Sequence, residues 1–95
     1  MNNVEQFKDI VDRMALIYEM KNNDYGDSTT DTYNRYGDIS FLTRLRDKLN
    51  RLDSLLVDNN TQQVQDEKVE DTILDLANYA VIFLMTYQNN KNNLF

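Results

Sequence analysis

Carboxylates recur one turn apart in the last third of the sequence. Glu67, Asp71 and Asp75 follow one another at steps of four, and the amide Asn78 comes three residues later. On an α-helix these steps place the side chains along one face. Because Mg²⁺ prefers oxygen ligands, the spacing predicts a magnesium site at Glu67, Asp71 and Asp75. The alternative is a solvated acidic face, since the helix dipole favours carboxylates near a helix N-terminus.

Asp75 and Asn78 lie deeper in this stretch than the other polar residues. Asp75 stands between Leu74 and Leu76, and Asn78 is surrounded by apolar and aromatic residues. Burial of either side chain requires a partner, because an unpaired buried polar group is costly. Two interpretations of Asn78 stay open: it binds a ligand, or it bonds a neighbouring helix within the core.

Cationic side chains form a second row in the middle of the chain. Arg44, Lys48 and Arg51 step by four and three, so a helix would carry them on one face. Each Arg offers a planar fork of donors that suits phosphate oxygens. The row therefore predicts a phosphate site, with salt bridges to the acidic helix as the alternative. An acidic and a basic row across one cleft are what a nucleotide site with a metal requires.

A third group of polar residues follows the first apolar stretch of the chain. Lys21 has the reach to contact a phosphate, Asp24 can bond a ribose or a metal-bound water, and Tyr25 can stack on a base. These three residues complete the predicted nucleotide site. The alternative is a simple helix stop, because Asn, Asp and Gly26 favour turns for local backbone reasons.

Three amphipathic helices are expected to position these side chains. Apolar residues recur at steps of three and four over about 4–21, 39–57 and 66–88. The segment 22–38 lacks this period and is rich in Asp, Thr and Ser, so it is predicted as a loop. No stretch alternates as a strand does. The expected fold is a single all-α domain, a small bundle of three main helices that oligomerisation completes.

Composition excludes several classes of function. The 95 residues contain neither Cys nor His, which removes thiolate nucleophiles, disulfides and the commonest transition-metal ligand. The formal net charge of −6 disfavours binding to a nucleic-acid backbone. The longest apolar stretch is shorter than the roughly 20 residues that span a bilayer, and the chain starts without a signal-like segment. A cytoplasmic protein without a membrane partner is expected.

The same three groups of residues resemble a known family. Lys-Asn-Asn-Asp-Tyr-Gly at 21–26, Arg-Leu-Arg-Asp-Lys-Leu-Asn-Arg-Leu at 44–52 and the acidic stretch at 66–80 occur in order and with sensible spacing. Together they resemble the phage-associated nucleotide modification associated domain, over about residues 7–87. That family looks like a relative of the all-α, MazG-like nucleoside triphosphate pyrophosphohydrolases, which include the dimeric dUTPases. The resemblance implies nucleotide handling, Mg²⁺ as cofactor and a homo-oligomer.

The match to the MazG-like metal pattern is partial. Asp71 and Asn78 have the spacing of the superfamily's Asp and Asn, but Lys68 occupies the position of the expected Glu. A Glu-x-x-Glu pair on an earlier helix is also missing. Two hypotheses follow. The chain binds a nucleotide or nucleotide-derived signal with little or no turnover, as a phage would to withdraw a messenger from host defence, or it is a Mg²⁺-dependent pyrophosphohydrolase acting on canonical or modified nucleotides.

Overall fold

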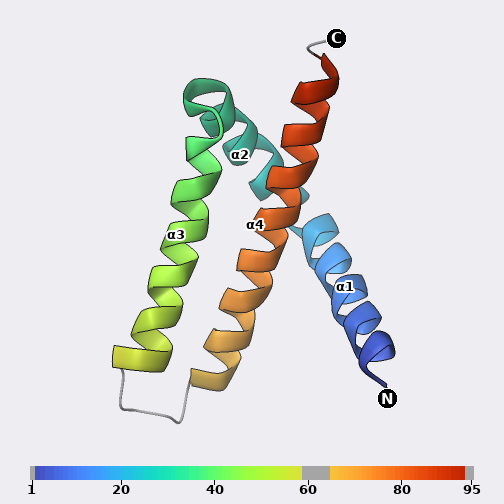
Figure 1. Ribbon diagram of the computed structural model, residues 1–95, viewed down its shortest axis with the longest axis vertical. Helices are drawn as coiled ribbons and strands as arrows, with labels where there is room; N and C mark the ends of the chain where they lie inside the picture. Colours follow the sequence, from blue (N-terminus) through green and yellow to red (C-terminus); the bar gives the residue numbers. More distant parts are fainter. Residues whose placement is uncertain (1, 59–64, 94–95) are drawn as a thin grey trace.

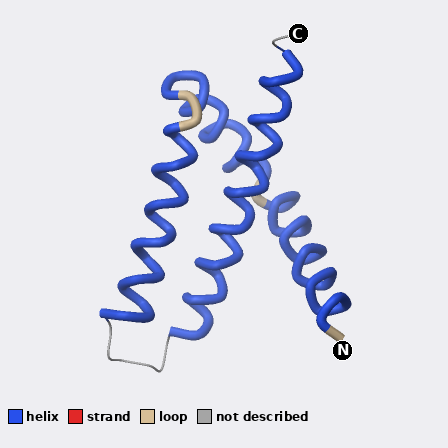
Figure 2. Tube along the Cα trace, viewed as in Figure 1, coloured by secondary structure: helices blue, strands red, loops and turns tan. Residues whose placement is uncertain are grey.

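The protein is almost wholly helical over the ranges that its computed structural model describes, residues 2–58 and 65–93 (Figures 1 and 2). Within them, the side chains of residues 23–28, 30, 65–67, 92 and 93 lie outside the description. The helices are α1 (Asn3–Met20), α2 (Asn22–Tyr36), α3 (Ile39–Asp53) and α4 (Gln65–Asn93), and a turn of π-helix, η1 (Ser54–Asp58), continues α3. The described ranges contain no strand, which confirms the predicted all-α fold.

The main difference from the predicted fold lies in the segment predicted as a loop. The pattern predicts a loop over 22–38, but α2 covers most of it, so the bundle has four helices in its described part rather than three. Thr29 and Tyr33 lie one turn apart on α2, and Thr29 is buried while Tyr33 packs against Phe41 of α3. These tertiary contacts outweigh the turn-favouring composition of the segment.

The first helix stops where it is predicted to, at Met20, but Gly26 lies within α2, and the glycine that ends a helix is Gly37. Gly37 ends α2 with φ 70°, a left-handed conformation that suits glycine, and its N–H donates to the carbonyl of Tyr33 at 2.7 Å. The Ser40 hydroxyl then donates to the Gly37 carbonyl at 2.8 Å. This turn directs α3 back alongside the rest of the bundle.

Helices α3 and α4 lie side by side and run antiparallel (Figure 1). Phe41, which is 1% exposed, anchors the pair from α3 and forms the core with Ile82 of α4. Its ring stacks on that of Phe83, with centroids 4.9 Å apart and planes within 8°. An aromatic stack of this kind adds to the gain from burial. The core is therefore concentrated near the end of α3 that adjoins α2.

Helix α1 lies on the other side of α4 from α3 (Figure 1). A capping box fixes its start: the Glu5 N–H donates to Asn2 Oδ1 at 2.8 Å, and the Asn2 N–H donates to Glu5 Oε2 at 3.3 Å. None of its residues is buried. No helix in the described ranges is long and apolar enough to cross a membrane.

Candidate functional site

The cationic row of α3 faces α4. Lys48 Nζ lies 3.2 Å from Asp75 Oδ2 in a salt bridge, and these side chains are 27% and 26% exposed. One turn earlier, the guanidinium of Arg44 lies 5.5 Å from the ring centroid of Tyr79. Arg44 Nη1 is also 3.5 Å from the Tyr79 hydroxyl. The structure thus places an arginine and a lysine of the predicted phosphate site in contact with the acidic helix.

Arg51 extends this arrangement by one more turn. Its Nε donates to Thr72 Oγ1 at 3.2 Å, and that hydroxyl donates to the Lys68 carbonyl at 2.6 Å. Arg51 is exposed, and its other four N–H donors have no partner among the described residues. Arg51 is therefore the member of the row best placed to meet a solute.

The three contacts share one register. From Arg44 to Lys48 to Arg51 the residue number rises by four and then three, while from Tyr79 to Asp75 to Thr72 it falls by four and then three. Antiparallel helices that match i, i+3 and i+4 ridges produce such a ladder. We define the cationic row as Arg44, Lys48 and Arg51. Its α4 partners Tyr79 and Thr72 were not predicted from sequence, although the matching steps on the two helices carry that information.

Asn78 is a buried polar side chain whose Nδ2 has no partner in the described part of the chain. It is 4% exposed, and its Nδ2 bonds no other group in the described part of the structure. It lies one turn beyond Asp75 and next to Tyr79, on the helix that faces the cationic row. Within the described residues Nδ2 therefore forms no bond to a neighbouring helix, and both interpretations of Asn78 stay open.

Asn78 lines a cavity of about 280 Å³ between α1 and α4. The other side chains around it are apolar apart from the Tyr18 hydroxyl, and they come from both helices: Val11, Met14, Ala15, Val81, Ile82 and Met85. An amide in such surroundings has little opportunity to exchange bonds with bulk water. We call this cavity the Asn78 cavity.

The predicted magnesium ligands have different environments. Asp75 is engaged by Lys48, and Asp71 is exposed on the next turn. The side chain of Glu67 lies outside the described residues, as do those of Asp24 and Tyr25. The described side chains include no group of three acidic residues that could hold a metal ion. Lys48 engages Oδ2 of Asp75, so a cation bound by this carboxylate would lie beside the Lys48 ammonium or replace it.

Lys21 lies where α1 meets α2. It caps the end of α1, where its backbone N–H donates to the Ile17 carbonyl at 3.0 Å, and it is exposed. The cationic row lies on α3, and α4 stands between α3 and α1. No described contact joins Lys21 to the row, so the structure does not bring these two predicted phosphate contacts together.

Comparison with known proteins identifies a family. No curated protein and no solved structure is significantly similar to the chain. The sequence profile of a family described as "Nucleotide modification associated domain 1" matches residues 21–87, well over half of the chain. The matched segment contains the cationic row, its α4 partners and Asn78. The chain belongs to the nucleotide modification associated domain 1 family.

Proposed function

We propose that the chain binds a nucleotide or nucleotide-derived signal and holds it with little or no turnover. Asn78 is the observation that carries this proposal. Its buried Nδ2 has no partner in the described residues, and such a group costs about 1–3 kcal/mol. A ligand oxygen or ring nitrogen would satisfy it. The cationic row of α3, on the other side of α4 from the Asn78 cavity, would meet phosphates.

Asp75 supports binding without turnover. Phosphoryl transfer depends on a metal ion and positioned charge to stabilise the transition state. The salt bridge to Lys48 already engages one oxygen of the Asp75 carboxylate, Oδ2, and brings a positive charge to the predicted metal position. Ground-state binding needs no such metal, so affinity persists where hydrolysis is weak. A phage sequestering protein that withdraws a nucleotide messenger needs only the first property.

The direct test is recovery of the ligand. The purified chain is dialysed against a panel of canonical, modified and cyclic nucleotides, with Mg²⁺ or with a chelator, then denatured by heat and analysed by mass spectrometry. We expect one class of nucleotide to be depleted from solution and recovered intact, in both buffers. Multiple-turnover release of pyrophosphate or monophosphate with Mg²⁺ would instead establish the MazG-like pyrophosphohydrolase, with Glu67, Asp71 and Asp75 as ligands. Depletion of no nucleotide would contradict both.

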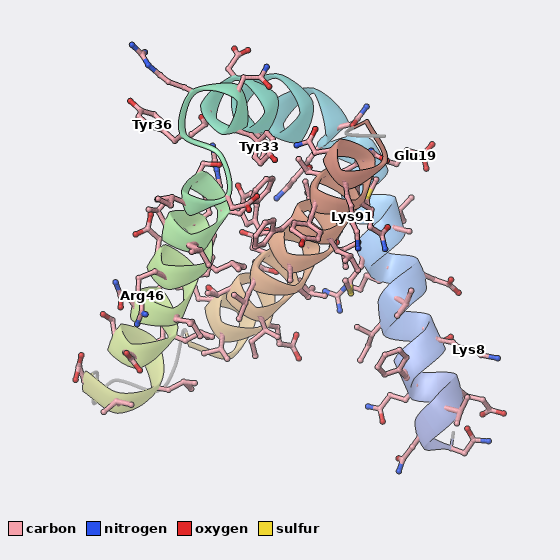
Figure 3. All side chains as sticks on the ribbon, turned by 45° about the horizontal axis from the view of Figure 1, so that its top comes forward. Lys8, Glu19, Tyr33, Tyr36, Arg46 and Lys91 are labelled. Atoms are coloured by element: carbon pink, nitrogen blue, oxygen red, sulfur yellow. The ribbon has the colours of Figure 1, made fainter. Side chains whose placement is uncertain are left out.

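Charge reversal tests the cationic row. Arg51→Glu should weaken nucleotide binding about tenfold or more, because a charged hydrogen bond is lost and repulsion is added. Arg46→Glu is the matched control, since Arg46 is exposed on the same helix and points away from α4 (Figure 3). Added salt should weaken binding of the unmodified protein as well. Equal affinity of the two variants would remove Arg51 from the site.

A further inference from the structure

A separate cavity of about 300 Å³ lies near the end of the bundle where α2 meets α3 and α4. Every side chain that lines it is uncharged. Phe41 contributes a buried aromatic wall, and Tyr33 lies beneath α2, toward the space between α3 and α4 (Figure 3). We call it the amide cavity, because three asparagines from two helices line it: Asn34, Asn89 and Asn90.

The amide cavity combines an apolar interior with polar groups of both kinds. Asn90 Nδ2 donates to the Tyr33 hydroxyl and so ties α4 to α2. Asn34 and Asn89 are exposed, which places them at the opening. Each carboxamide offers two N–H donors and a carbonyl acceptor. The cavity therefore matches a ligand that is flat, neutral and edged with both donors and acceptors.

These properties identify the ligand class. A phosphate would enter a cavity with no lining cation, and burial of an uncompensated charge is unfavourable. A nucleobase is uncharged and planar, and it carries amine or amide donors beside carbonyl and ring-nitrogen acceptors. A volume of about 300 Å³ is at the small end of ligand sites, which suits a base or nucleoside. We infer that the amide cavity binds the base of the nucleotide, an inference that rests on the proposed function.

The spacing along α3 connects the amide cavity to the cationic row. Arg44 follows Phe41 by three residues, about 4.5 Å along the helix axis at 1.5 Å per residue. By the same rise Lys48 lies about 10 Å away and Arg51 about 15 Å away. A ligand with its base beside Phe41 therefore meets Arg44 first and Arg51 last. Arg51 should matter more for a triphosphate than for a monophosphate.

The two cavities are neighbours. Tyr18, Ile82 and Met85 line both the amide cavity and the Asn78 cavity. A nucleoside in the amide cavity would thus contact the side chains that also line the Asn78 cavity. Asn78 lines only the second cavity, one turn before the shared Ile82.

The test separates the base from the phosphates. Titrations of the full chain with adenosine, guanosine, cytidine and thymidine, followed by NMR, probe the amide cavity without phosphate. Titration with pyrophosphate probes the cationic row without a base. We expect one of the nucleosides to bind and to shift the carboxamide signals of Asn34 and Asn89. We expect pyrophosphate to leave those signals in place.

Variants of matched size assign the effect. Asn34→Leu and Asn89→Leu should each weaken nucleoside binding about tenfold, because each removes one hydrogen bond to the base. Both variants should leave pyrophosphate binding unchanged. Gln88→Leu is the control, because Gln88 is exposed next to Asn89 and does not line the cavity. Arg51→Glu should weaken pyrophosphate binding and leave nucleoside binding unchanged. Melting curves verify that each variant is folded.

The outcomes distinguish the two proposals. If nucleotides bind but both asparagine variants behave like Gln88→Leu, the base lies elsewhere and this inference is wrong, while the proposed function stands. If nucleosides bind in the amide cavity and neither nucleotides nor pyrophosphate bind more tightly, the phosphate site of the proposed function fails alone. If neither nucleosides nor nucleotides bind, both are overturned.

Discussion

The segment that the family profile matches and the helix before it are built differently. Residues 21–87 contain the buried Phe41, its stack on Phe83 and the ladder between α3 and α4. Helix α1 lies entirely before the match and buries none of its residues. Both regions have the apolar period of an amphipathic helix. The period alone therefore tells which face is apolar, but not whether another part of the same chain covers it.

The overall dimensions also show that part of the chain is loosely packed. The radius of gyration is 15.3 Å, whereas a compact chain of this length is expected near 12 Å. Phe7 and Val4 of α1 are 70% and 63% exposed. The α3–α4 pair behaves as the centre of a domain, and α1 behaves as a helix whose apolar face is still open.

Phe41→Ala should produce the largest effect and tests whether the α2–α4 segment is the stable unit. Removal of a fully buried Phe typically costs 3–5 kcal/mol, roughly half the stability of a small domain. Chemical unfolding followed by circular dichroism measures the change. Leu42→Ala, at the neighbouring exposed position, should cost far less. Similar losses in the two variants would show that the core is not centred on Phe41.

Asn78→Leu should raise the stability of the protein, whereas Phe41→Ala should lower it. The substitution preserves approximate size and removes a buried donor that has no partner, so the free energy of unfolding should rise by about 1–2 kcal/mol. Nucleotide binding should be lost in the same variant. Asn50→Leu, at an exposed position on α3, is the control. A fall in stability for Asn78→Leu would show that Asn78 is a structural amide completed by a buried water.

The sequence could predict α3 and α4 because their apolar steps are regular over several turns. It could not predict α2 in the same way. The segment from Gly26 to Gly37 is dominated by residues whose side chains compete with helical hydrogen bonds. Its helix depends on contacts of Thr29 and Tyr33 with other elements, which local pattern does not contain. The sequence feature that indicates a helix in this segment is Gly37, because glycine often follows the last residue of a helix.

The sequence predicts which cationic residues share one face of a helix, but not which residues of α4 they meet. Arg44, Lys48 and Arg51 were assigned to one face, and they do lie on one face of α3. Their contacts with Tyr79, Asp75 and Thr72 depend on how far α3 slides along α4. That offset is set by packing around Phe41 and Ile82, which is a property of two helices together. The amide cavity escaped prediction for the same reason, since its asparagines are far apart in sequence.

A double-mutant cycle on Lys48 and Asp75 measures the ladder itself. With Lys48→Met, Asp75→Asn and the double variant, we expect a coupling energy of about 0.2–1 kcal/mol, because both side chains are about a quarter exposed. Raised salt should reduce it. The pair Arg46→Met and Asp75→Asn should be additive, since Arg46 faces away from α4. A coupling near zero in low salt would mean that α3 and α4 are held together by the aromatic core alone.

The smallest effect on the stability of one chain should come from Phe7→Lys, which tests the open face of α1. Phe7 is largely exposed, so its replacement should change the free energy of unfolding of the monomer by no more than about 0.5 kcal/mol.

Self-association of the chain should respond more strongly to Phe7→Lys than its stability does. We expect the unmodified chain to self-associate at micromolar concentration through α1, because an apolar face of this extent is unusual on a monomer, and Phe7→Lys should shift the equilibrium toward single chains. Sedimentation equilibrium of both proteins over a range of concentrations gives the answer, with Lys8→Ala, the adjacent change on the same helix, as control. A clean monomer for the unmodified chain at every concentration would mean that α1 stays uncovered by a second copy, and the predicted oligomer would then have to be abandoned.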